Sequence, residues 1–166
     1  MSAVVIDENV LIVAEKRMLE GDLTDEHIRS CIEALRKAKT QRIVLDTQNV
    51  ILRKYIKHFK PVRNNGAGSE FLIWLMEGGQ HMSERCERVT ITPLETSFAE
   101  VPLELRVRDA ANQIFDLDDH IWLAVAKASV NNPMILNATD TDWYHWRDRL
   151  EAHGFQIQFL CPELMT

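Results

Sequence analysis

The sequence predicts an α/β fold, a three-layer α/β/α sandwich around a central, mainly parallel sheet of about five strands. Short β-branched runs such as 3–6 and 42–46 alternate along the chain with segments of helical apolar spacing. This alternation is typical of parallel sheets that helices cover on both faces. The chain has 166 residues, of which 46% are hydrophobic, and this suits one domain with a substantial core. We therefore treat residues 1–166 as a single domain.

Strands and helices alternate from the N-terminus onward. Five strands are expected, over 3–6, 42–46, 88–95, 133–138 and 155–160. Six helices are expected between them, one opening after Thr24 and the others over 8–18, 49–59, 70–79, 118–129 and 142–154. Thr24 is a suitable N-cap, and Pro61, Gly78 and Gly154 are suitable stop signals. Residues 96–115 are ambiguous, with a short helix expected near 109–113.

Three aspartates stand where one edge of the sheet can collect them. Asp7 ends the first strand, Asp140 follows the fourth strand, and Asp119 begins the helix that leads into the fourth strand. Ligand sites in parallel α/β sheets lie at the carboxyl ends of the strands. Each aspartate alone is well explained as a helix N-cap. Capping does not explain why all three fall at one edge, so we predict a joint acidic site.

Three segments resemble the motifs of PIN domains, a family of metal-dependent nucleases. VVIDENVLIVA resembles the opening motif, in which a strand-terminal aspartate is followed two residues later by a polar residue, here Asn9. FDLDDHIWLAVAKAS resembles the third acidic motif, ILNATDTDW resembles the last motif, and FQIQFLCP suits the final strand. The motifs have the family's order and approximate spacing, and the resemblance covers nearly the whole chain. It implies a PIN-like fold.

The resemblance implies a site for one or two Mg²⁺ or Mn²⁺ ions. Asp7, Asp119 and Asp140 match the catalytic metal ligands of the family, Asp142 an auxiliary ligand, and Asn9 a supporting polar group. Hard divalent cations prefer oxygen ligands. Two such ions can activate a water and stabilise the leaving oxygen in phosphodiester hydrolysis. The implied activity is that of an endonuclease, with single-stranded RNA expected as the substrate rather than DNA.

One position departs from the family pattern. The family carries a glutamate on the helix after the second strand, whereas LDTQNVILRKYIKHF has Lys54 at that place. A lysine there could pair with Asp7 or Asp119 and occupy the position of a cation. Three explanations stay open. The site works with three acids, helped by Asp46; or the protein is a non-catalytic PIN-like module that binds RNA or a protein; or the chain is an inactivated variant of an enzyme.

Charge is unevenly distributed along the chain. The net charge of −6 argues against a protein that coats nucleic acid through bulk attraction. Residues 47–69 contain no acidic residue and carry +5, so the rest of the chain carries −11. The candidates for phosphate contacts in this segment are Arg53, Lys57, Lys60 and Arg63. A solvated helix face with a basic tail is an equally good explanation of the same segment.

The remaining patterns limit the other classes of function. The three cysteines form no paired motif, so we expect buried free thiols rather than a zinc site or disulfides. The tryptophans are expected in the core more than on a base-stacking surface, and the histidines are expected at the surface or at helix caps. A receiver-like phosphate-handling domain is a weaker alternative, because the paired acids and the later lysine of that class are missing.

Location and partners are expectations of the same kind. No apolar run approaches the ~18 residues of a membrane-spanning helix, and no export signal is evident at the N-terminus. We therefore expect a cytoplasmic protein. The PIN resemblance further implies a toxin or an RNA-processing factor, an antitoxin or another protein partner, and a homodimer.

Overall fold

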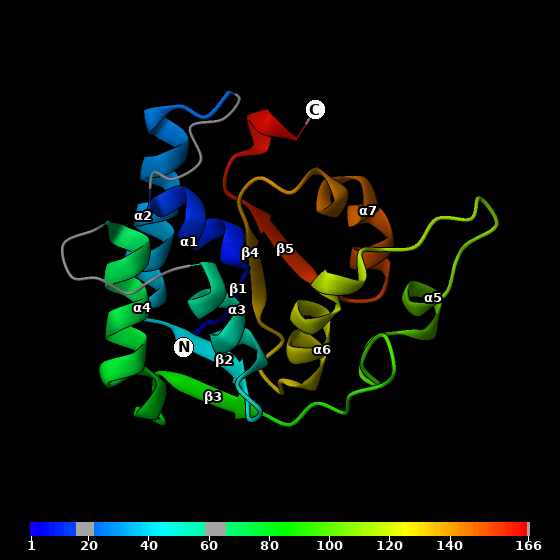
Figure 1. Cartoon of the computed structure of the whole chain (residues 1–166), viewed down its shortest axis with the longest axis horizontal. Coiled ribbons are helices and arrows are strands. Elements are labelled where there is room, and N and C mark those ends of the chain that lie inside the picture. The colour runs from blue at the N-terminus through cyan, green and yellow to red at the C-terminus, as the bar shows by residue number, and fades with distance from the viewer. Residues whose placement is uncertain (16–21, 59–65, 166) are drawn as a thin grey trace.

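The computed structural model describes residues 1–15, 22–58 and 66–165. Within these residues the centre is a five-stranded, entirely parallel sheet with the strand order β3-β2-β1-β4-β5. The strands are β1 (Ala3–Ile6), β2 (Arg42–Asp46), β3 (Cys86–Val89), β4 (Met134–Asn137) and β5 (Gln156–Phe159). The predicted fold class, a three-layer α/β/α sandwich with a parallel sheet, is confirmed (Figure 1).

Helices cover both faces of this sheet (Figure 1). The helices of one layer pack on one another and are α1 (Glu8–Ala14), α2 (Asp25–Ala38) and α4 (Ala67–Glu77). In the other layer, α6 (His120–Ala128) lies on β1, β2 and β4, and α7 (Thr141–Ala152) lies on β5. The remaining long helix, α3 (Val50–His58), contacts both α1 and α6. It therefore joins the two layers.

Short elements complete the described chain. The helix α5 (Leu103–Arg106) lies in the long connection between β3 and α6. Three single turns of 3-10 helix are η1 (Gly79–His81), η2 (Leu117–Asp119) and η3 (Pro162–Leu164). No described helix is long and apolar enough to cross a membrane. The three cysteines are buried free thiols, as predicted.

The N-cap at Thr24 and the spacing of apolar residues explain why α2 forms. Thr24 Oγ1 accepts the His27 N–H at 3.4 Å, and His27 Nδ1 accepts the Thr24 N–H at 3.1 Å, so the predicted N-cap is confirmed. The apolar face of α2 includes Ile28, Cys31 and Leu35, which are all buried. Residues at this spacing share one side of a helix, and here that side packs on α1 and α4.

The segment from 88 to 115 differs from its prediction. β3 ends at Val89 rather than at residue 95, because its last partner is Asp46, where β2 itself ends. The predicted helix near 109–113 is wrong. Asp109 Oδ1 instead accepts the N–H groups of Ala111 and Gln113 at 2.9 and 2.8 Å, which closes a turn.

The topology reverses its direction at β1. The chain builds outward from β1 to β2 and β3, and then returns to the other side of β1 to form β4 and β5. Ile6 pairs with Leu136, and the Asp7 N–H donates to the Leu136 carbonyl at 3.0 Å. Ligand sites of open α/β sheets form at the carboxyl ends of strands where the order reverses. Asp7 and Asn137 stand at that point.

Candidate metal centre

Asp7 connects β1 to α1 and is 2% exposed. Its Oδ1 accepts the Asn9 N–H at 3.0 Å, which makes Asp7 the N-cap of α1. Its Oδ2 accepts Asn137 Nδ2–H at 3.2 Å. Asn9 Oδ1 accepts the Ala138 N–H at 2.9 Å. Asn9, predicted as a supporting group, thus ties the end of β1 to the end of β4.

Asp119 and Asp140 approach Asp7 from two other elements. Asp119 is the last residue of η2 and directly precedes α6; it is 8% exposed and accepts Trp143 Nε1–H at 3.0 Å. Asp140 is the N-cap of α7, since its Oδ1 accepts the Asp142 N–H at 2.9 Å. Together with burial, the charge of Asp140 raises the pKa of Asp119, and Asn137 makes hydrogen bonds to both Asp7 and Asp140. The structure therefore brings together the three aspartates that the sequence singles out.

Asn137 is a site residue that sequence reasoning missed. It is fully buried at the end of β4, where it donates to Asp7 and accepts the Asp140 N–H on Oδ1 at 3.1 Å. One amide side chain thus orients two of the aspartates. Its position could have indicated this role in the sequence, because Asn137 is a polar residue that ends an otherwise apolar strand.

Glu8 is a second residue that sequence reasoning missed, and it adds a fourth carboxylate. Its Oε1 lies 3.5 Å from Lys54 Nζ and 3.8 Å from His58 Nε2. Its Oε2 is buried without a hydrogen-bond partner, and, together with burial, its charge raises the pKa of Asp7. Its sequence signal is the Asp-Glu pair at the end of β1.

The acids perturb one another electrostatically. Burial raises the pKa of Asp7 well above its ordinary value, and the charges of Glu8 and Asp119 raise it further. Burial also raises the pKa of Asp119 to about 8, with Asp140 as the largest charged contributor. The pKa of Asp140 is raised as well, first by burial. Carboxylates in this situation hold a proton or require a cation.

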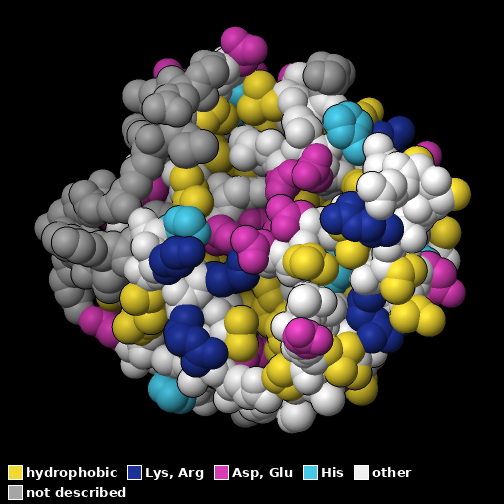
Figure 2. Space-filling view, turned by 45° about the vertical axis from the view of Figure 1, so that its right-hand side comes forward, with side chains coloured by type: hydrophobic (Ala, Val, Ile, Leu, Met, Phe, Trp, Pro, Cys, Tyr) yellow, Lys and Arg dark blue, Asp and Glu magenta, His cyan; other side chains and the backbone are white. Residues whose placement is uncertain are grey.

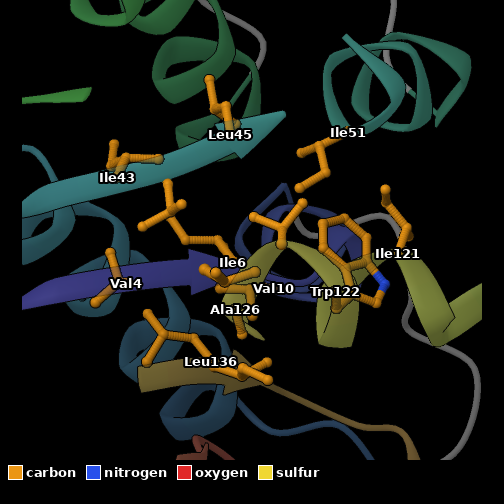
Figure 3. Packing of buried hydrophobic residues seen from close by; sticks show 14 of the residues in the cluster. Val4, Ile6, Val10, Ile43, Leu45, Ile51, Ile121, Trp122, Ala126 and Leu136 are labelled. Atoms are coloured by element: carbon orange, nitrogen blue, oxygen red, sulfur yellow. The ribbon is translucent and has the colours of Figure 1, made fainter. Parts of the chain in front are cut away.

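Apolar packing causes this burial. Ile6, Val10 and Trp122 cluster at the carboxyl end of β1 (Figure 3). Tyr55 stacks on Trp122 with ring centroids 6.1 Å apart, and its hydroxyl donates to the Ile6 carbonyl at 2.6 Å. The hydrophobic contacts that stabilise the core therefore also exclude water from the carboxylates beside them.

Lys54 lies on the helix after β2, as the sequence places it, but pairs with a different acid from the two suggested. Its ion pair is with Glu8 rather than with Asp7 or Asp119, and its ammonium lies 5.8 Å from the centroid of the Trp122 ring. Asp46, predicted as a supporting acid, is fully buried, and its two oxygens accept the Val50 and Ile51 N–H groups at 2.8 and 3.0 Å. Asp46 thus serves the start of α3.

The other predicted residues that the structure describes lie at the surface. Asp142 is exposed at the start of α7, and Arg53 and Lys57 are exposed on α3. Lys60 and Arg63 lie outside the described residues. Figure 2 shows acidic side chains gathered at the centre of one face, with basic side chains on both sides of them.

Whether this site suits a divalent cation depends on the atoms that could act as its ligands. Within the described ranges, no three Asp, Glu, His or Cys side chains already stand at the spacing of ligands around one metal ion. The gathered side chains nevertheless offer oxygen donors alone, which hard cations prefer. The buried Glu8 Oε2, which lacks a donor, is an oxygen that a cation would satisfy.

Comparisons of the chain with protein-family models, with curated proteins and with solved structures found no match. The resemblance to PIN domains therefore stays a prediction. It is supported by the motif residues and by the positions that those residues occupy at the reversal of the sheet.

Proposed function

We propose that the protein is a PIN-like endoribonuclease that depends on Mg²⁺ or Mn²⁺ and hydrolyses single-stranded RNA. The observation that carries this proposal is the convergence of Asp7, Glu8, Asp119 and Asp140 at the point where the parallel sheet reverses. Buried acids that face one another destabilise a fold unless a ligand compensates them. Strongly perturbed pKa values of this kind are typical of functional sites.

Each residue has a defined part in this proposal. Asp7, Asp119 and Asp140 would hold the cation, and Glu8 supplies the fourth carboxylate in place of the glutamate expected at position 54. When bound, the cation would supply Lewis-acid activation of a water and stabilisation of the leaving oxygen. Asn137 orients Asp7 and Asp140 through its amide, and the Trp143 indole orients Asp119. Asp142 stands beside Asp140 as an auxiliary ligand.

The basic side chains of α3 support a polyanionic substrate. Arg53 and Lys57 are exposed on the helix that also carries Lys54. Basic groups beside an acidic metal site can hold the phosphates that flank a scissile bond. The preference for RNA over DNA, contacts from Lys60 and Arg63, a toxin role, an antitoxin and a homodimer rest on the family resemblance alone.

The Lys54–Glu8 pair favours a second candidate, a non-catalytic PIN-like module that binds RNA or a protein. An ammonium 3.5 Å from Glu8 Oε1 competes with a cation for that carboxylate. If Lys54 keeps this position, the site binds no metal and the fold serves recognition alone. The two candidates share their RNA-binding surface and differ in metal dependence.

Cleavage of labelled single-stranded RNA separates these candidates. The chain would be assayed with Mn²⁺ and with EDTA beside Asp119→Asn, Glu8→Gln and Lys54→Glu, with Glu104→Gln as the control at an exposed acid outside the cluster. The proposal predicts cleavage in Mn²⁺ that Asp119→Asn abolishes and Glu104→Gln retains. Cleavage by Lys54→Glu alone would identify a disabled site. RNA binding without cleavage by any of these variants would support the non-catalytic module.

A further inference from the structure

A pocket of about 300 Å³ lies beside the acidic cluster. It is bounded by the turn at residues 93–98 and by residues 117–121, which lead into α6. Its size is at the lower end of the range of about 300–1,000 Å³ for small-molecule pockets. A single flat ring system with part of a sugar is an appropriate occupant, whereas a folded peptide is too large.

Two residues connect this pocket to the proposed metal centre. Lys54 lines the pocket and also pairs with Glu8. Asp118 lines the pocket and directly precedes Asp119. A ligand in the pocket therefore lies one side chain away from the carboxylate cluster.

The walls of the pocket combine apolar surfaces with a few charged groups. Leu94 and Leu117 are 43% and 39% exposed, and Phe98 lines the pocket with them. Exposed apolar surface of this kind favours an aromatic ring that loses contact with water on binding. Glu95 and Asp118 add carboxylates that can accept N–H groups from a ligand.

The wall at residues 93–98 is preorganised. Pro93 and Phe98 form an antiparallel bridge, and the Leu94 N–H donates to the Ser97 carbonyl at 2.8 Å. Ser97 Oγ lies 2.7 Å from His120 Nδ1 in a buried contact. His120 is thus buried, contrary to the prediction of a surface or capping role, and it fixes the turn against α6. A preformed wall reduces the ordering cost of binding.

We propose that this pocket binds one nucleobase of a single-stranded RNA, with a preference for guanine. Bases of single strands are unstacked and can be turned into a protein pocket. Guanine presents two adjacent N–H donors on one edge, N1–H and the 2-amino group, and these match the two oxygens of one carboxylate. Lys54 then faces the phosphate that joins this nucleotide to the next. The proposal deepens the proposed function and rests on it for the identity of the polymer.

The experiment measures base binding without any cation. The four nucleoside 5′-monophosphates and inorganic phosphate would be titrated into the full chain in EDTA, with the methyl signals of Leu94, Leu117 and Ile121 followed by NMR. Leu94→Trp fills the pocket, and Leu103→Trp is its control at an exposed leucine outside the pocket. Glu95→Gln removes one carboxylate, and Glu104→Gln is the matched control.

The expected result is a saturable shift with guanosine monophosphate that is at least about fivefold tighter than with uridine monophosphate. Leu94→Trp abolishes this shift and Glu95→Gln reduces the preference for guanine, while the two controls behave as the unmodified chain. The inference is overturned if no nucleotide shifts these methyl signals, if inorganic phosphate produces the same shifts, or if all four bases bind equally. Because the titration is done in EDTA, its result does not depend on metal binding or on cleavage. Failure of base binding can therefore be distinguished from failure of the proposed function.

Discussion

Two groups of buried or half-buried carboxylates differ in what surrounds them. Asp46 is fully buried, and both of its oxygens accept backbone N–H groups at the start of α3. Glu15 is 6% exposed and accepts the N–H and the hydroxyl of Ser69 at 2.7 and 2.5 Å. Asp7, Glu8 and Asp119 also have polar partners, but they have other acids beside them as well. Together with burial, the like charges beside Asp7 and Asp119 raise the pKa of both carboxyls, and these charges distinguish the second group.

Burial of an acid therefore has opposite energetic consequences in the two groups. A carboxylate with donors on both oxygens and no acid beside it is part of the folding energetics of its helix. A carboxylate that faces other carboxylates raises the free energy of the fold until a proton or a cation arrives. Mutations in the first group should therefore change the stability of the fold, whereas mutations in the second group should change ligand binding.

The largest expected effect belongs to the structural group. Asp46→Ala removes the acceptors of one buried and one partly buried N–H group and should lower the free energy of unfolding by about 3 kcal/mol. Thr24→Ala, which removes the cap of α2, should lower it by about 1 kcal/mol. Urea unfolding followed by circular dichroism measures both changes. A smaller loss for Asp46→Ala than for Thr24→Ala would contradict the role assigned to Asp46.

In the absence of metal, replacing a carboxylate of the second group should raise the stability of the fold rather than lower it. Because the folded-state pKa of Asp119 is raised to about 8, the folded protein binds this proton more tightly than the unfolded chain. Its contribution to stability is complete below about pH 4 and is lost as the pH rises through about 8. Asp119→Asn should therefore flatten this dependence and add roughly 2 kcal/mol of stability at pH 8 in EDTA.

Thermal unfolding in EDTA between pH 4 and 9 measures this difference. Asp118→Asn, at the exposed neighbouring position, is the control and should follow the unmodified chain. Equal pH dependence in the unmodified chain and in Asp119→Asn would show that Asp119 is not the titrating group.

A smaller effect is expected at Lys54. Its ammonium lies 3.5 Å from Glu8 Oε1, so Lys54→Met removes a cation that competes for Glu8. The affinity for Mn²⁺ should rise by roughly three- to tenfold, which corresponds to about 1 kcal/mol. Isothermal titration calorimetry measures the change, with Lys57→Met as the control on the same helix. A weaker affinity in Lys54→Met would mean that Lys54 orders the site rather than competing for it.

The smallest effect is expected on α3. The double variant Arg53→Gln with Lys57→Gln should weaken binding of single-stranded RNA about equally for all sequences. It should also reduce the slope of log affinity against log salt by about 1 to 2. Arg29→Gln with Lys37→Gln on α2 is the matched control. An unchanged salt slope would remove α3 from the RNA-binding surface.

The sequence predicts the fold well because its signals are local. β1 and β2 were predicted with their observed ends, since each is a short apolar run that closes on an aspartate. The end of β3 was not predictable in this way, because it depends on where β2 stops as its partner. Pairing between distant segments leaves no mark in the periodicity of either segment.

The site is only partly predictable for the same reason. Asp7 and Asp46 look alike in sequence, as each ends an apolar strand before a helix. Their difference comes from the strand order, which places β1 and not β2 at the reversal of the sheet. Asn137 and Glu8 gain their roles through contacts across elements, with Asp7 for the first and Lys54 for the second. Neither contact follows from spacing along the chain.

The most direct test of the proposed metal centre is a Mn²⁺ titration of the full chain at pH 8, followed by electron paramagnetic resonance of the unbound ion. Asp119→Asn and Glu8→Gln would be titrated beside it, with Asp46→Asn as a buried acid outside the cluster. We predict saturable binding at millimolar or tighter affinity. Asp119→Asn abolishes this binding, Glu8→Gln weakens it about tenfold, and folded Asp46→Asn retains it. Absence of saturable binding up to 10 mM Mn²⁺, which is about tenfold weaker than millimolar affinity, or undiminished binding by Asp119→Asn, would contradict this prediction.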